Sequence, residues 1–177
     1  MLTLMLLRHA KSSWDDPAQP DFERPLAKRG KKAAPAVGAA LARMGLRPDL
    51  VICSGAARAK ETLALVLAEL GSPTPQVVYD DAVYMAQPEA LLARLRRIKA
   101  DEIGGVPRHV MLVGHNPGLE DLALLLVRDG AAGDLALLAE KFPTGAVAVI
   151  AFNAKSWSSV EPGAGRLEHF LSPKRLP

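Results

Sequence analysis

The chain has 177 residues, enough to bury the core of one domain, and we expect a single domain spanning residues 1–177. Hydrophobic residues make up 49% and charged residues 23%, as in a globular protein, while 5% aromatic residues are too few for the stacking platforms of single-strand nucleic-acid binders. The net charge of +3 favours anionic ligands only weakly. We expect the basic run between Lys28 and Lys32 to be a solvated helix start, with a docking surface for an acidic protein or a phosphate-rich ligand as the alternative.

Cysteine use and apolar runs indicate a cytoplasmic protein that does not associate with membranes. Cys53 is the single cysteine, which excludes an intramolecular disulfide, and it ends an apolar run that predicts a buried position. Met1–Leu7 lacks a basic leader, so we do not expect a signal peptide. The longest later apolar run, Leu122–Val127, is far too short to cross a bilayer.

The first predicted strand is Leu4–Leu7, a near-continuous apolar run typical of a strand that is covered on both faces in a parallel sheet. A helix follows, because apolar residues recur at helical spacing over residues 33–44. Pro35 costs little only if this helix begins near Lys31 or Lys32; otherwise we expect it to kink the helix, because a proline deeper in a helix removes a hydrogen bond.

The middle of the chain repeats the alternation of strand and helix. Leu50–Cys53 is the second predicted strand, and a helical stripe over residues 63–70 ends at Gly71, where glycine suits a left-handed cap. A further helical stripe covers residues 91–98, and Pro88 is suited to the first turn of that helix.

The last third begins with the predicted strand Val110–Val113 and a leucine-rich helix that follows Pro117. Two β segments, Ala146–Phe152 and Arg166–Leu171, flank a turn rich in serine, glycine and proline, so we expect them to pair antiparallel at one side of the sheet. The pattern as a whole predicts an α/β fold: a mainly parallel central sheet with helices on both faces and right-handed crossovers.

Charged and polar residues follow each of the three near-continuous strands. Arg8 and His9 come after the first strand, Ser54 and Arg58 after the second, and His115 after the third. The carboxyl ends of parallel strands meet at one crevice, where ligands of such sheets bind. Two imidazoles and two guanidiniums gathered there suit a small, multiply charged anion such as a phosphoryl group.

Each of these side chains has a chemical role that a phosphoryl group would use. Arg8 and Arg58 offer parallel N–H donors that match phosphate oxygens. His9 would attack phosphorus through Nε2 if an acceptor fixed its Nδ1–H, and a protonated His115 would be a further donor. Backbone N–H groups at the start of the helix after Ser54 would add to the anion site.

Several motifs in this order resemble the histidine phosphatase superfamily, which has the phosphoglycerate mutase-like fold, and more narrowly its SixA-type phosphohistidine phosphatase branch. They are Leu-Arg-His-Ala-Lys-Ser at 7–12, Arg-Pro-Leu at 24–26, Ser-Gly-Ala-Ala-Arg-Ala-Lys-Glu-Thr at 54–62, Gly-His-Asn-Pro at 114–117 and Phe-Pro-Thr-Gly at 142–145. The resemblance implies a phosphohistidine intermediate on His9 that water hydrolyses. It also implies a phosphate pocket made by Arg8, Arg58 and His115, without a metal or other cofactor.

The remaining candidate residues have two interpretations each. Asp81 lies three residues before Tyr84, the offset at which superfamily members that act on esters place a general acid, but it could equally be a turn residue. Arg24 would line the mouth of the pocket or form a surface ion pair, and Ser12 would shape its rim or only pack. Asn116, beside His115, is a candidate for substrate binding.

We expect a phosphatase that hydrolyses phosphohistidine on a protein, such as a histidine-containing phosphotransfer domain. A phosphatase of small phosphorylated metabolites, which would need the acid Asp81, and a non-catalytic module that binds phosphate or phosphoprotein are the alternatives. A nucleic-acid-binding domain has only the pI of about 9.2 in its favour. Four histidines without cysteine or carboxylate at ligand spacing do not indicate a metal site.

Overall fold

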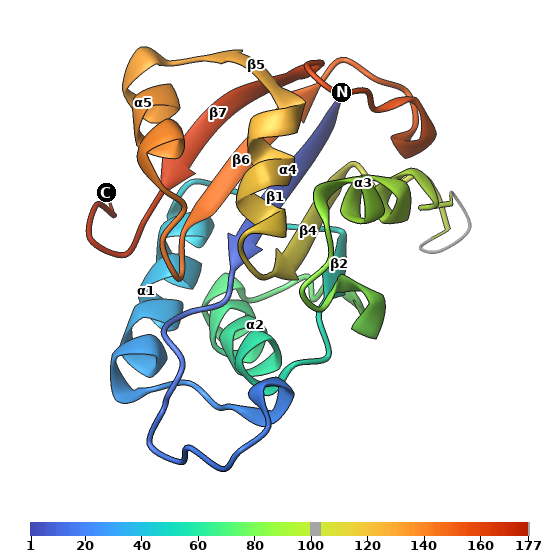
Figure 1. The fold of residues 1–177 in the computed structure, drawn as a ribbon. Helices are drawn as coiled ribbons and strands as arrows, with labels where there is room; N and C mark the ends of the chain where they lie inside the picture. Colours follow the sequence, from blue (N-terminus) through green and yellow to red (C-terminus); the bar gives the residue numbers. More distant parts are fainter. Residues whose placement is uncertain (100–103, 177) are drawn as a thin grey trace.

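A seven-stranded sheet forms the centre of the protein, in the order β3-β2-β4-β1-β6-β7-β5 (Figure 1). The computed structural model describes residues 1–99 and 104–176. Only β6 runs against its neighbours, because β1 to β4 are parallel to one another and β5 is parallel to β7. The strands are β1 Leu2–Arg8, β2 Leu50–Cys53, β3 Gln76–Tyr79, β4 His109–Gly114, β5 Val127–Gly130, β6 Val147–Phe152 and β7 Gly165–Leu171.

In the part of the chain that the structure describes, five α-helices cover the two faces of this sheet, as the alternating pattern predicts. They are α1 Lys28–Arg43, α2 Ala57–Leu70, α3 Pro88–Arg96, α4 Gly118–Leu126 and α5 Ala132–Glu140. Helices α1 and α2 pack on one face, and α3 and α4 on the other. The expected mainly parallel α/β fold is therefore confirmed.

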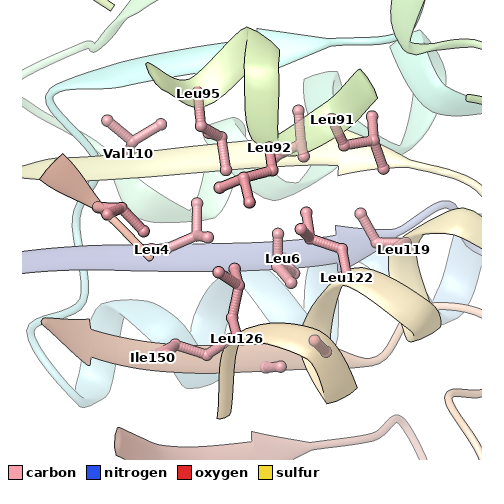
Figure 2. Packing of buried hydrophobic residues seen from close by; sticks show 14 of the residues in the cluster. Leu4, Leu6, Leu91, Leu92, Leu95, Val110, Leu119, Leu122, Leu126 and Ile150 are labelled. Atoms are coloured by element: carbon pink, nitrogen blue, oxygen red, sulfur yellow. The ribbon is translucent and has the colours of Figure 1, made fainter. Parts of the chain in front are cut away.

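Alternating side chains of the central strands divide the core into two layers. Leu4 and Leu6 of β1 point toward the leucines of α3 and α4, as Figure 2 shows. Met5 and Leu7 point to the opposite face, toward α1 and α2. All four are fully buried, which explains why β1 reads as an unbroken apolar run: a strand covered on both faces needs an apolar residue at each position.

The prediction for the start of the first helix is wrong. Helix α1 begins at Lys28 rather than near Lys31 or Lys32, and Pro35 lies inside it. Gly30, in the first turn of this helix, lies so close to Lys11 that an added Cβ would be 2.2 Å from the Lys11 carbonyl oxygen. The preceding Ala27 gives the helix no side-chain cap.

The expected antiparallel pair at the end of the chain is present as β6 and β7. Neither strand is at the sheet edge, however, because β5 pairs with the outer side of β7. Three elements were not anticipated from the sequence: β3, β5 and α5. Gly71 has a positive φ of 68° at the end of α2, but its ψ of −153° lies outside the left-handed helical region, so the predicted left-handed cap is not formed. Cys53 is buried as predicted.

Candidate active site

His9 lies immediately after β1, at the edge of the sheet where the parallel strands end. Its ring Nδ1 is 2.7 Å from the Ala10 carbonyl oxygen, so Nδ1 carries the proton and donates it, which leaves a lone pair on Nε2. The Nε–H of Arg58 points at this Nε2 over 3.4 Å. The side chain is only 7% exposed. His9 thus presents a neutral nitrogen with a free electron pair beside a guanidinium.

Arg58 is the second residue of α2, which follows strand β2 and the loop that begins at Ser54. Its Nη2 forms an ion pair with Asp21 Oδ2 at 2.9 Å, while its Nε faces His9. The guanidinium is 3% exposed. A phosphoryl oxygen that arrives next to His9 would meet the Nε–H of Arg58, since Nη1 and Nη2 are both hydrogen-bonded to Asp21.

Arg8 is held by the segment that precedes β6. Its Nη1 donates to the Phe142 carbonyl oxygen at 2.7 Å. The Gly145 N–H, at 3.1 Å from each, is shared by the carbonyl oxygens of Arg8 and His9. Arg8 Nε is buried and has no hydrogen-bond partner in the described residues. An unsatisfied buried donor costs about 1–3 kcal/mol, and an anion bound here would satisfy it.

His115, which follows β4, completes the cluster. The centroids of the His9 and His115 rings are 5.1 Å apart. His115 Nε2 is 2.8 Å from Ser54 Oγ, and its buried Nδ1 has no partner among the described residues. The three loops after β1, β2 and β4 therefore bring their imidazoles and guanidiniums together as the sequence predicts.

Both histidines are neutral at physiological pH. Burial lowers the pKa of His9 to about 4; the Ala10 carbonyl opposes this shift, and the charges of Arg58, Arg8 and Arg24 add to it. Burial also lowers the pKa of His115 to about 3, with further lowering by His9 and Arg58. These charges repel a proton on either ring and attract an anion between them.

Asp21 and Tyr84 also belong to the site, although the sequence did not single them out. Asp21, in the short 3-10 turn Asp21–Glu23, accepts hydrogen bonds from Tyr84 Oη and Arg58 and forms an ion pair with Arg24 at 3.0 Å. The Tyr84 hydrogen bond, helped by Arg58, lowers the pKa of Asp21 to about 2. The same bond raises the pKa of Tyr84. In the sequence, the spacing of three residues between Asp21 and Arg24 could have indicated their ion pair. The contact between Asp21 and Arg58 depends on the fold and has no such signal.

Tyr84 also covers one side of His115. Its ring stands edge-on to the His115 ring, with centroids 5.2 Å apart, and edge-on to Phe22 at 4.9 Å. These two aromatic rings exclude water from one side of the cluster and contribute to the burial that keeps His115 neutral.

Arg24, Ser12 and Asn116 surround this cluster rather than lying within it. Arg24 donates to Ser12 Oγ at 3.0 Å and stacks over the Trp14 ring, with Cζ 3.5 Å from the ring centroid. Asn116 donates to Glu120 and to the Phe142 carbonyl oxygen, the same acceptor that Arg8 uses. Their contacts fix the positions of Asp21 and Arg8.

Asp81 lies next to the loop that leads into α2. Its Oδ1 is so close to Gly55 that a Cβ there would be 1.8 Å away. The side chain is exposed. Its neighbour Asp80 has a structural role, because it caps the turn at Ala82 and pairs with Arg94 at 2.7 Å.

Within residues 1–99 and 104–176, no three histidine, cysteine, aspartate or glutamate side chains are grouped as a metal site would need. No helix in the same ranges has both the length and the apolar character needed to span a bilayer.

Known proteins match both the sequence and the fold. Residues 4–83 match the model of the histidine phosphatase superfamily (branch 1). An uncharacterized protein of Mycobacterium tuberculosis is 34% identical over 172 residues, which covers 95% of this chain and all of that protein.

Among solved structures, a protein from Nakamurella multipartitia named phosphohistidine phosphatase SixA superimposes with a TM-score of 0.80 and 31% identity, covering 97% of this chain and 96% of that one. A protein from Agrobacterium tumefaciens with the same name gives a TM-score of 0.77 and 31% identity, covering 97% and 99%. The chain therefore belongs to the histidine phosphatase superfamily, in its SixA-type branch, and is a hydrolase of the phosphatase class.

Proposed function

We propose that this protein hydrolyses phosphohistidine on a partner protein, such as a phosphotransfer domain, through a phosphohistidine intermediate on His9 and without a metal ion. The environment of His9 carries the proposal. Its Nδ1–H is held by the Ala10 carbonyl at 2.7 Å, and its Nε2 faces the phosphate-binding donors of Arg58. A pKa of about 4 keeps this nitrogen unprotonated at neutral pH, which a nucleophile requires.

In the first step, His9 Nε2 forms a bond to phosphorus while the bond between phosphorus and the substrate imidazole breaks. The leaving nitrogen keeps the electron pair, and because the other ring nitrogen of the substrate is protonated, the product is a neutral imidazole. Arg8, Arg58 and His115 bind the equatorial oxygens as charge develops. Arg8 Nε and His115 Nδ1, both buried without partners in the described residues, are the positions that we assign to these oxygens.

In the second step, water attacks the phosphorus of the phosphorylated His9. The bond between phosphorus and Nε2 breaks, inorganic phosphate leaves, and a water proton remains on phosphate or passes to solvent. His9 regains its lone pair, while the Ala10 carbonyl keeps hold of the Nδ1 proton throughout.

The charge state of Asp21 supports a phosphohistidine substrate over a phosphate ester. An alkoxide leaving group must receive a proton from the enzyme, whereas an imidazole whose other ring nitrogen is already protonated leaves as a neutral molecule. Asp21, the carboxylate that contacts Arg58, has a pKa of about 2 and so holds no proton to give. The names of the SixA-type relatives from Nakamurella multipartitia and Agrobacterium tumefaciens also support this substrate.

A second candidate is hydrolysis of small phosphate esters, and the position of Asp81 favours it. The Asp81 carboxylate lies against Gly55, in the loop before Arg58, so it is near enough to the site to be considered as a general acid. If Asp81→Asn cripples ester hydrolysis and leaves phosphohistidine hydrolysis intact, Asp81 protonates ester leaving groups and both substrates use one pocket.

The main test traps the intermediate. The enzyme is mixed with a histidine-phosphorylated peptide carrying radioactive phosphate, quenched rapidly in alkali, and assayed for acid-labile phosphoprotein. We expect labelled protein with the wild type and with His109→Ala, which replaces an exposed histidine at the start of β4, and none with His9→Ala. Turnover in EDTA should match turnover without it. Full turnover by His9→Ala, or activity that EDTA removes and a divalent ion restores, would contradict the proposal.

A further inference from the structure

A groove of about 870 Å³ adjoins the candidate active site and is larger than a phosphoryl group needs. It meets the site at Arg8 and extends along α1, the end of α5, the segment before β6 and the C-terminal segment after β7. In Figure 1 the C-terminal segment lies on the same side of the molecule as α1 and α5. The groove does not include His9, so it is a separate surface next to the catalytic cluster.

The groove is strongly cationic. Besides Arg8 it is lined by Lys11, Arg29, Lys32, Lys141, Lys174 and Arg175, and Glu140 is the one carboxylate side chain among the described lining residues. These residues give the groove a net charge of +6, whereas the whole chain carries +3, so the rest of the molecule is net negative. The modest overall charge therefore conceals a concentrated positive surface.

The groove cations form no ion pairs with carboxylates of the described residues. Six other arginines do form such ion pairs: Arg24, Arg58, Arg94, Arg96, Arg128 and Arg166. These like charges lie along one surface, so they create a positive potential that attracts anions.

The chemistry of the lining indicates what kind of anion binds. Between the cations lie apolar side chains, among them Leu137, Phe170 and Pro173. A polyanion without apolar groups cannot bury apolar surface against these side chains. An amphipathic protein segment can bury its apolar side there and point its carboxylates at the surrounding lysines and arginines. Because Arg8 belongs to both surfaces, a segment in the groove would lie beside the phosphoryl site.

We propose that this groove docks an acidic, amphipathic segment of the phosphohistidine-bearing protein substrate. The inference rests on the proposed function, since it names the surface by which such a substrate would be recognised. Docking in the groove would raise the local concentration of the phosphohistidine near His9 and would speed encounter through charge attraction.

The test separates docking from catalysis. Binding of an unphosphorylated amphipathic peptide rich in aspartate and glutamate is measured by fluorescence anisotropy, against a twin peptide with asparagine and glutamine at those positions. We expect the wild type to bind the acidic peptide roughly tenfold tighter or more than the neutral twin, with an advantage that declines as salt is added. Lys32→Glu combined with Arg175→Glu should remove the advantage.

The matched control is Lys155→Glu combined with Arg108→Glu, which reverses one lysine and one arginine at exposed positions near the other end of the sheet. It should keep the preference for the acidic peptide. Both double variants should hydrolyse a small phosphoramidate at the wild-type rate, which shows that the active site is folded. Equal binding of the two peptides, or equal loss in both variants, would overturn the proposal.

Two further outcomes distinguish a failure of the docking proposal from a failure of the proposed function. If a double-stranded oligonucleotide or inorganic polyphosphate displaces the acidic peptide at equal or lower concentration, the groove is a general polyanion site and docking of a protein segment is refuted. If the acidic peptide binds as expected but its histidine-phosphorylated form is not dephosphorylated, the proposed function fails and the docking surface stands.

Discussion

The depressed pKa of His9 makes a sharp prediction about activity in mild acid. With a pKa of about 4, roughly nine-tenths of His9 remains neutral at pH 5, whereas a histidine with the ordinary pKa of about 6.5 would be about 3% neutral. Lowering the pH from 7 to 5 should therefore reduce kcat/KM by only about a tenth through His9. An unperturbed nucleophile would lose about 25-fold.

Two measurements check this pKa. The first follows the His9 ring by nuclear magnetic resonance between pH 3 and pH 8 in the free enzyme, with His9→Gln to identify its signal. The second follows kcat/KM with short incubations, corrected for the spontaneous hydrolysis of acid-labile substrate. A ring that titrates near pH 6.5, or a loss of kcat/KM of about 25-fold between pH 7 and pH 5, would refute the idea that burial and three guanidiniums hold His9 neutral.

The same shift affects stability. Because the folded pKa is lower than the unfolded one, the unfolded chain binds more protons below pH 6.5, and the free energy of unfolding falls as the pH drops from 6.5 toward 4. For the buried His9 this loss amounts to roughly 3 kcal/mol by pH 4. Denaturant titrations of the wild type and His9→Gln should therefore converge, with the wild type losing more stability in acid. Parallel pH profiles would contradict the shift.

Three other perturbations have clear expected results. Gly30→Ala would place a Cβ 2.2 Å from the Lys11 carbonyl oxygen, so it should lower the free energy of unfolding by about 1–3 kcal/mol in denaturant titrations and lower kcat/KM. In the control Gly133→Ala, the added Cβ has nothing within 4 Å and should raise the free energy of unfolding by about 0.5–1 kcal/mol. A loss of stability in Gly133→Ala would undermine the reasoning. Arg58→Lys, which lacks the planar fork, should reduce kcat/KM about 100-fold or more, and an active variant would show that the fork is dispensable. Cys53, whose pKa burial raises to about 12, should react with a thiol reagent only after unfolding, so rapid labelling of the native protein would contradict its placement.

How far the sequence predicts this fold depends on burial. Strands β1, β2 and β4 are covered on both faces, so each is a continuous apolar run that is visible without a structure. The edge strands lack this signal: β3 is exposed or half-buried throughout, and β5 contains Arg128 and Asp129 in its four residues. Their strand conformation comes from pairing with a neighbour rather than from their own residues.

The same distinction applies to the site. Arg8, His9, Arg58 and His115 each follow a recognisable strand or motif, so their convergence could be predicted from topology. Asp21 could not be found in this way, because it belongs to a short turn in the loop between β1 and α1, and its partners Arg58 and Tyr84 are 37 and 63 residues away. Contacts across such loops depend on how the loop packs, which periodicity does not encode.

The reversed direction of β6 has a consequence for how recognition can diversify. In a wholly parallel sheet, only segments that leave strands reach the ligand-binding edge. Here the segment that enters β6 also reaches the ligand-binding edge. There the Phe142 carbonyl oxygen accepts hydrogen bonds from Arg8 and Asn116, and the Gly145 N–H donates to the carbonyl oxygens of Arg8 and His9. A change of length or composition in this entering segment would alter what the protein recognises, and the loops that carry His9, Arg58 and His115 would remain as they are.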